Sequence, residues 1–232
     1  MELVLIRHAQ PAWRAADTGL STNDPELTPL GQEQAAQLAE WMGGTDRPAV
    51  DGLFVSTARR SRQTAAALEQ VLGLPADVQP WLVEIGAPEE WHGRPEDEVV
   101  ATLDAIKTRP LEEWWDGAPG GESFRDFHAR VTEGIESLLA GYGAGRHARD
   151  PERLWDVPDE GPRLVLVAHL GTNSVLTSHL LGIDPQPWEW ERFACDHSSV
   201  TVLRSRAIAD GDIWALEHFS GVAHLAPGQV TA

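Results

Sequence analysis

The stretch Leu164-Val165-Leu166-Val167-Ala168-His169-Leu170-Gly171 gives the clearest structural signal in the sequence. Its first five residues are apolar, which is typical of a strand buried on both faces of a sheet. A histidine follows at once, and a helical pattern then continues through Leu181. Because a buried strand that leads into a helix is the repeating unit of α/β proteins, this stretch predicts an α/β fold.

Two earlier stretches repeat the same order of strand and helix. Glu2 to Ile6 (ELVLI) and Leu53 to Val55 are further apolar runs that predict buried strands. After the first run, Thr28-Pro29 predicts a helix start, since a capping residue followed by proline is typical there, and Gly43-Gly44 predicts its end. The second run leads through Ser56 into another amphipathic helix.

The rest of the chain is less regular. Residues 80–121 are rich in Trp, Pro and Glu and are predicted to be irregular, and a helix is expected to begin after Ser123. Gly141 to Pro162 is predicted to be a loop. Ser199 to Leu203 and Ile213 to Phe219 predict two closing strands. Neither a repeat nor a sharp break in composition divides the chain, so we expect a single domain over residues 1–232.

The composition argues against a protein that binds nucleic acid or an anionic membrane. The chain has 232 residues, of which 42% are hydrophobic, and the excess of acidic over basic residues gives a net charge of −18. Such a charge disfavours binding to nucleic acid or to an anionic membrane. The opening MELVLIRHAQ has no basic leader, and a lone Cys195 cannot form an internal disulfide, so we expect a cytoplasmic protein.

Polar residues follow the predicted strands where each strand ends. Arg7-His8 follows the first strand, Ser56 and the arginine-rich segment 59–62 follow the second, and His169 follows the third. The carboxyl ends of parallel strands meet at one edge of a sheet, where ligands bind in open α/β folds. Two histidines and at least two arginines should therefore gather in one crevice.

This set of side chains suits a phosphate group. An arginine presents a planar fork that matches two phosphate oxygens, and helix N-termini add backbone N–H donors. Because the set contains no metal-ligand pattern, one imidazole is expected to attack phosphorus itself. Neither a metal nor another cofactor is expected.

The residues around these strand ends resemble the histidine phosphatase superfamily, the phosphoglycerate-mutase-like proteins. The matching blocks run in the family's order and cover most of the chain: Arg7-His8, Leu27 to Gln32 (LTPLGQ), Arg60 in STARRSRQTA, Glu84 in LVEIG, Pro119 to Ser123 (PGGES), His169 in VLVAHLG, and SSVTVL near the end. The resemblance implies a three-layer α/β/α sandwich with a mostly parallel central sheet.

The resemblance also implies a role for each site residue. His8 would be the nucleophile that becomes a phosphohistidine, and Glu84 would protonate the leaving oxygen and later activate water. Arg7, Arg60 and His169 would bind the phosphate. The substrate would be a small phosphate monoester, and the enzyme a histidine acid-type phosphatase.

The sequence departs from the family pattern after the nucleophile. The usual RHGxT is here Arg7-His8-Ala9-Gln10-Pro11, where alanine is harmless only if its φ is negative. The family often has Asn after a Trp at the position where this chain has Trp13-Arg14, so Arg14 is a further candidate for a phosphate contact. The segment APEEWHG after Glu84 replaces a small acidic block.

Other motifs carry no chemistry of their own. Gly141, Gly143 and Gly145 follow a helix rather than a strand, which argues against a dinucleotide loop. PGGES is interpreted as a helix start, and Arg59 and Arg62 are expected to face solvent. Seven other histidines are treated as ordinary: His92, His128, His147, His179, His197, His218 and His224.

The sequence therefore predicts a metal-independent phosphatase. Two alternatives stay open. A cofactor-dependent phosphoglycerate mutase would share the site, although the stretch from Glu84 to Gly121 lacks the longer insertion known in mutases. A catalytically degenerate protein that only binds a phosphorylated ligand is the other alternative, because the motif after His8 is altered.

Overall fold

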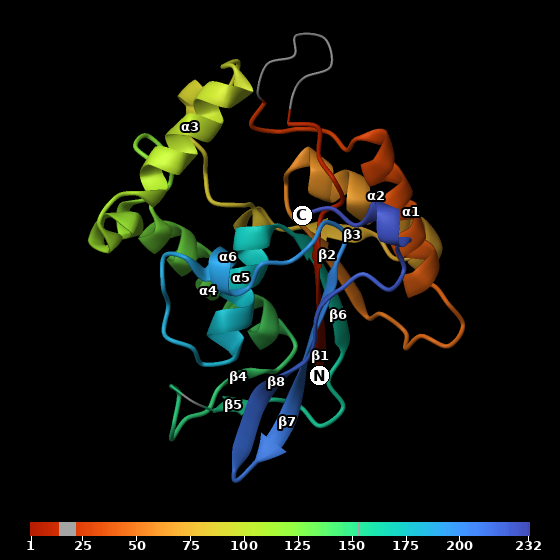
Figure 1. Cartoon of the computed structure of the whole chain (residues 1–232). Helices are drawn as coiled ribbons and strands as arrows, with labels where there is room; N and C mark the ends of the chain where they lie inside the picture. The colour runs from red at the N-terminus through yellow and green to blue at the C-terminus, as the bar shows by residue number, and fades with distance from the viewer. Residues whose placement is uncertain (14–21, 153) are drawn as a thin grey trace.

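The computed structural model describes residues 1–13, 22–152 and 154–232, and these residues form one eight-stranded sheet with helices on both faces (Figure 1). The strand order is β3-β2-β6-β1-β7-β8-β5-β4. The strands are β1 (Glu2–Arg7), β2 (Gly52–Val55), β3 (Ala76–Val78), β4 (Gly145–Arg146), β5 (Trp155–Asp156), β6 (Arg163–Ala168), β7 (Val200–Ile208) and β8 (Gly211–Gly221).

The predicted α/β fold is confirmed, with a sheet that has a parallel and an antiparallel part. Strands β3, β2, β6 and β1 pair in parallel, with Arg7 opposite Ala168 at the carboxyl end. The other pairs, from β1 and β7 to β5 and β4, are antiparallel. A tight turn rather than a crossover helix joins β7 to β8, which lets these two strands pair antiparallel. The candidate catalytic residues follow the carboxyl ends of β1, β2 and β6, and all three strands belong to the parallel part.

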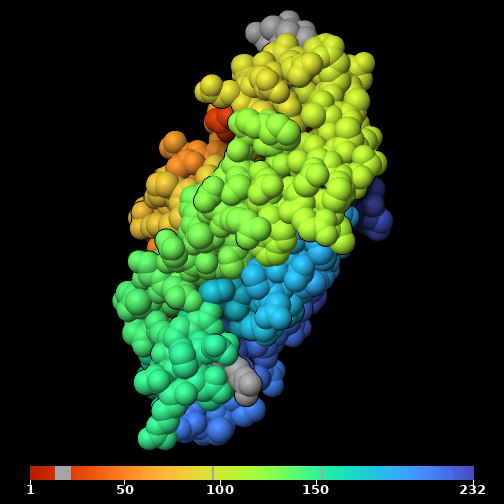
Figure 2. All heavy atoms as spheres, turned by 90° about the vertical axis from the view of Figure 1, so that its left-hand side faces the viewer, coloured from red at the N-terminus to blue at the C-terminus, as the bar shows by residue number. Residues whose placement is uncertain are grey.

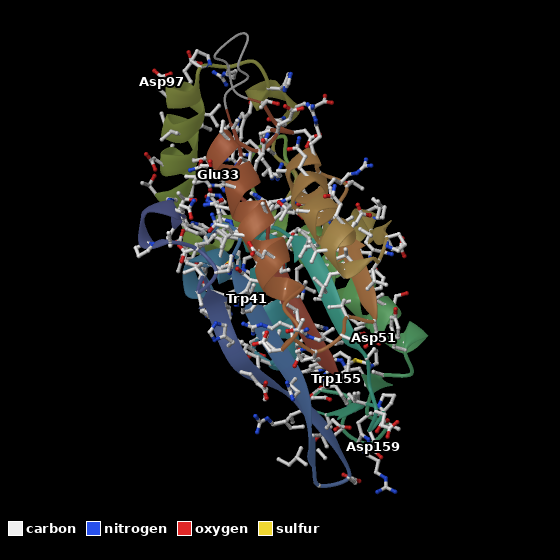
Figure 3. All side chains as sticks on the ribbon, turned by 90° about the vertical axis from the view of Figure 1, so that its right-hand side faces the viewer. Glu33, Trp41, Asp51, Asp97, Trp155 and Asp159 are labelled. Atoms are coloured by element: carbon white, nitrogen blue, oxygen red, sulfur yellow. The ribbon has the colours of Figure 1, made fainter. Side chains whose placement is uncertain are left out.

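Helices cover both faces of the sheet. They are α1 (Pro29–Met42), α2 (Arg59–Leu72), α3 (Glu96–Lys107), α4 (Phe124–Gly141), α5 (Leu170–Leu180) and α6 (Glu189–Arg192), with short 3₁₀ turns η1 (Pro80–Leu82), η2 (Glu89–Trp91), η3 (Leu111–Asp116) and η4 (Pro227–Gln229). Figure 3 shows α1, with Glu33 and Trp41, in front of one face of the sheet.

Alternation along β1 explains the two cores. Leu3 and Leu5 belong to a cluster with α4 and α5, whereas Val4 and Ile6 belong to a cluster with α1 and α2. Successive side chains of a strand point to opposite faces, so a continuous apolar run is needed when both faces are covered. The predicted sandwich of three layers follows from this pattern.

The predicted helix starts are confirmed by their caps. The Thr28 hydroxyl accepts the N–H of Gly31 at 2.9 Å, and the Ser123 hydroxyl accepts the N–H of Asp126 at 3.0 Å. Each side chain satisfies a backbone donor that the first helical turn leaves free, which is worth about 1 kcal/mol.

Two segments differ from the sequence prediction. The stretch predicted to be irregular contains the twelve-residue helix α3, and the predicted loop after Gly141 contains the short strands β4 and β5. Strands of two residues leave too short a pattern to be seen in a sequence. In the described part of the chain, no helix combines the length and the apolar character that crossing a membrane requires.

Candidate active site

The parallel strands bring the predicted residues to one edge of the sheet. Arg7 ends β1 and His8 follows it, while Ser56 follows β2 and His169 follows β6. The rings of His8 and His169 are edge to face, with centroids 5.1 Å apart. Helices α2 and α5 begin directly after these residues, so their N-terminal N–H groups face the same edge.

The hydrogen bonds of His8 fix which nitrogen is free to react. Nδ1 lies 2.8 Å from the carbonyl oxygen of Ala9, which can only accept, so Nδ1 carries the proton. Nε2 accepts from Nε of Arg60 at 3.2 Å and therefore keeps its lone pair. Burial, together with the nearby His169 and Arg60, holds the pKa of His8 well below its ordinary value. The imidazole is a neutral base with its lone pair toward the guanidinium.

His169 is fully buried, and its Nε2 lies 2.8 Å from the hydroxyl of Ser56 and 3.4 Å from that of Ser61. Its Nδ1 is buried without a hydrogen-bond partner among the described residues. When Ser56 donates to Nε2, the ring proton stands on Nδ1, which then offers a donor to a bound anion. Burial, with the charges of Arg60 and Arg7, lowers the pKa of His169 well below its ordinary value.

Arg7 is held by a residue that the sequence analysis treated as ordinary. Its guanidinium donates to Nε2 of His197 at 3.0 Å and to the carbonyl oxygen of Cys195. Nδ1 of His197 in turn donates to the hydroxyl of Thr231 at 3.0 Å. Burial and the charge of Arg7 lower the pKa of His197 to about 3. His197 is therefore a neutral acceptor that orients Arg7, and its ring lies 5.6 Å from that of His8.

The three neighbouring arginines of α2 differ in burial, as the sequence predicts. Arg60 is only 5% exposed and contacts His8. Arg59 is exposed and pairs with Glu26, and Arg62 is exposed as well. Burial lowers the pKa of Arg60, while the charges of Glu84 and Asp24 raise it. Of these three, Arg60 is the one that the fold turns toward the histidines.

Glu84 lies between the end of η1 and the start of α5. One carboxylate oxygen accepts the N–H of Gly171 at 2.8 Å, and the other accepts the N–H of Ile85 at 3.0 Å. A Cβ at position 171 would stand 2.5 Å from the carboxylate, which explains the glycine in VLVAHLG. The carboxylate is thus fixed against the helix that follows His169.

Arg130 on α4 supports the segment that carries Glu84. Its guanidinium donates to the carbonyl oxygens of Trp81 and Val83 at 2.8 and 3.0 Å and pairs with Glu122 at 2.7 Å. Glu122 is the acidic residue of PGGES, so this block does more than start a helix. Arg130 could not be recognised from the sequence, because no short motif links it to residues 47 to 49 positions earlier.

The loop after His8 accommodates the altered motif. Ala9 is not among the described residues with positive φ, so alanine replaces glycine there without backbone strain. Its N–H donates to the hydroxyl of Thr64 at 3.0 Å. A Cβ at Gly31 would stand 2.2 Å from the carbonyl oxygen of Gln10, so the LTPLGQ block keeps this loop close to α1. Arg14, the further candidate for a phosphate contact, lies outside the described residues.

Comparison with known proteins assigns the family. A model described as the histidine phosphatase superfamily, branch 1, matches residues 3–209. The chain belongs to this superfamily. It is 30% identical to the glucosyl-3-phosphoglycerate phosphatase of Mycobacterium tuberculosis, over 80% of this chain and 78% of that protein. It is 25% identical to a probable phosphoglycerate mutase of Yersinia enterocolitica, over 97% and 95% of the two chains.

A solved structure of this superfamily has the same fold. The native structure of a mycobacterial glucosyl-3-phosphoglycerate phosphatase superposes with a TM-score of 0.69 at 28% identity, covering 96% of this chain and 99% of that one. The predicted family and fold are therefore confirmed. The roles of the individual site residues stay predictions.

Imidazoles that are buried or half-buried should make the histidine phosphatase sensitive to acid. The pKa of His197 is lowered to about 3, and burial and Arg146 lower that of His179. In the unfolded chain these groups take up protons near pH 6.5. The contribution of these two neutral imidazoles to the free energy of unfolding is therefore fully present above that pH. It should fall as the pH drops toward 4, by up to about 1.4 kcal/mol per pH unit for each imidazole.

Urea unfolding at about pH 7.5 and about pH 5 measures this loss. We expect a lower midpoint at pH 5, and a smaller difference between the two midpoints in His179→Gln. The control His92→Gln changes an exposed imidazole and should keep the wild-type difference. Equal midpoints at both pH values, or an unchanged difference in His179→Gln, would contradict the prediction.

Proposed function

We propose that this member of the superfamily is a phosphoric monoester hydrolase of the histidine acid type, acting on a small phosphorylated molecule. The observation that carries the proposal is the state of His8: a buried, neutral imidazole whose Nδ1–H is tied to a carbonyl and whose Nε2 lone pair faces Arg60. A nitrogen nucleophile in a cationic crevice suits attack on a phosphate.

The proposed first step moves the phosphoryl group to the protein. The Nε2 lone pair of His8 forms a bond to phosphorus while the bond from phosphorus to the leaving oxygen breaks. Glu84 gives its proton to that oxygen, so an alcohol departs. Arg7, Arg60 and Nδ1–H of His169 supply donors to the three remaining phosphoryl oxygens, where negative charge accumulates in the transition state.

The second step returns the protein to its starting state. Glu84, now a carboxylate, takes a proton from water, and the water oxygen attacks phosphorus. The bond from phosphorus to Nε2 breaks and inorganic phosphate leaves. In a mutase the acceptor would be a second alcohol instead of water, and the alternative is distinguished by the product: free phosphate or a transferred phosphoryl group.

The proposal predicts hydrolysis that does not depend on a metal. Arg7 and Arg60 provide the positive charge, and no group of three His, Cys, Asp or Glu side chains in the described residues could hold a metal ion. We expect hydrolysis of an aryl phosphate to persist in EDTA, and vanadate to inhibit it in a separate sample free of EDTA. Loss of activity in EDTA that added metal restores would overturn the mechanism.

A further inference from the structure

Two cavities meet at the segment that carries Glu84. The first, of about 500 Å³, is lined by both Arg60 and Glu84. The second, of about 410 Å³, shares Glu84, Trp91 and Leu103 with the first and continues toward α5. In the proposed reaction the leaving oxygen must stand between the phosphate and Glu84. The rest of the leaving group therefore extends into the first cavity.

Helix α3, which Figure 2 shows in yellow-green toward the upper end of the molecule, forms one wall of the first cavity. Val99, Val100 and Leu103 line it from this helix, and Ile85 and Trp91 add further apolar lining. Val100 and Leu103 are 47% and 42% exposed, and no described side chain of α3 is buried. Apolar surface left open beside a reactive site marks a place for an apolar ligand.

The charges around the first cavity disfavour a small acidic leaving group. Among the described residues that line it, Arg60 is the sole lysine or arginine, and it is already placed to bind the phosphate. The other charged residues there are Asp24 and Glu84, which are both acidic. Within the first cavity, a carboxylate on the leaving group would meet two acidic neighbours and no described cation besides Arg60.

We infer that the preferred substrates are phosphate monoesters whose alcohol is large and apolar, with its hydrocarbon body against α3. This inference rests on the proposed phosphatase activity and names its substrate class. It differs from the substrates that the names of these relatives give, which are phosphoglycerate, its glucosyl derivative and phosphoserine.

A series of linear alkyl phosphates isolates the effect of the cavity. Ethyl, butyl and hexyl phosphate have leaving groups of nearly equal acidity, so their chemical reactivity is matched and only the buried apolar surface grows. Each methylene that leaves water should raise kcat/KM by up to about fourfold. We expect hexyl phosphate to exceed ethyl phosphate by at least about tenfold, and to exceed phosphoglycerate and phosphoserine.

Matched variants test whether α3 is responsible. Leu103→Gln should reduce the dependence on chain length, and Leu103→Arg should also raise the rate with phosphoglycerate. The control Leu111→Gln changes a leucine that is 56% exposed and lines neither cavity, so it should keep the wild-type dependence. Hydrolysis of para-nitrophenyl phosphate, followed in parallel, reports on the proposed function itself.

The outcomes separate the two proposals. No phosphate release from any ester would refute the phosphatase activity. Release without a rise along the alkyl series, or a rise that Leu103→Gln leaves unchanged, would overturn the apolar site alone. A preference for phosphoglycerate would also overturn it and would point to Lys107 and Arg109, which line the second cavity. A wild-type dimer that Leu103→Gln turns into a monomer would identify the face of α3 as an interface instead.

Discussion

Arg60→Ala should lower kcat/KM by more than about a hundredfold, the effect of removing one donor that stabilises a transition state. Arg59→Ala and Arg62→Ala should change it little. The three arginines lie within four residues, yet Arg60 alone of them is buried and contacts Nε2 of His8. Arg59 pairs with Glu26 in solvent, where an ion pair contributes little.

The split between kcat and KM shows how Arg60 acts. A guanidinium that strengthens its bonds as the phosphoryl group transfers affects kcat, whereas one that only binds the ground state affects KM. We expect a large fall in kcat. Arg60→Lys keeps the charge but loses the planar fork, and it should retain part of the rate.

Steady-state kinetics of the three alanine variants and Arg60→Lys, each checked for folding by circular dichroism, tests this assignment. Equal losses in Arg59→Ala, Arg60→Ala and Arg62→Ala would show that the orientation of α2 has been wrongly assigned. A full rate in Arg60→Ala would remove Arg60 from the proposed mechanism.

Those parts of the fold that rest on local patterns could be predicted from the sequence. The continuous apolar runs of β1 and β6 predicted strands covered on both faces, and Thr28 and Ser123 marked helix starts through their own hydroxyls. The strand ends that bring His8 and His169 together follow from the parallel pairing of these strands.

Helix α3 was missed, although it carries a signal. Val99, Leu103 and Ile106 stand at the helical spacing of four and three residues, but Pro95 precedes the helix and no side chain caps it. None of the described residues of α3 is buried. Its apolar residues therefore have helical spacing, but they do not form the wide apolar face by which a core helix is recognised in a sequence. The Trp, Pro and Glu residues on either side of α3 are typical of irregular chain and hide its short helical pattern.

His197 could not have been recognised from its neighbours. It lies 190 residues after Arg7, and only the antiparallel pairing of β7 beside β1 brings the two together. Its partner Thr231 comes from the end of the described chain, which returns to the same edge of the sheet (Figure 1). Contacts of this kind depend on topology, which local patterns do not encode.

The second large effect concerns the covalent intermediate. His8→Ala should abolish hydrolysis, because no other described imidazole in the site has an Nε2 lone pair directed at Arg60. His169→Ala should slow the reaction without removing the intermediate, since His169 offers a hydrogen bond and not the nucleophile in the proposed mechanism. Rapid-quench experiments with ³²P-labelled substrate measure both.

Glu84→Gln is the variant in which the intermediate should accumulate. Glutamine cannot take a proton from water, so the second step should slow more than the first when the leaving group needs no protonation, as with an activated aryl phosphate. A phosphoramidate is labile in acid and stable in base, whereas phosphoserine is not labile in acid. The two kinds of phosphoprotein are therefore distinguished chemically.

The most direct test of the mechanism is to locate the label in Glu84→Gln quenched after reaction with a labelled aryl phosphate. The proposed mechanism predicts an acid-labile, base-stable phosphoprotein whose label maps to the peptide with His8 and disappears when His8→Ala is added. A label on His169 would reverse the roles of the two histidines. An active enzyme that carries no phosphohistidine under these conditions would contradict the mechanism and favour direct attack by water.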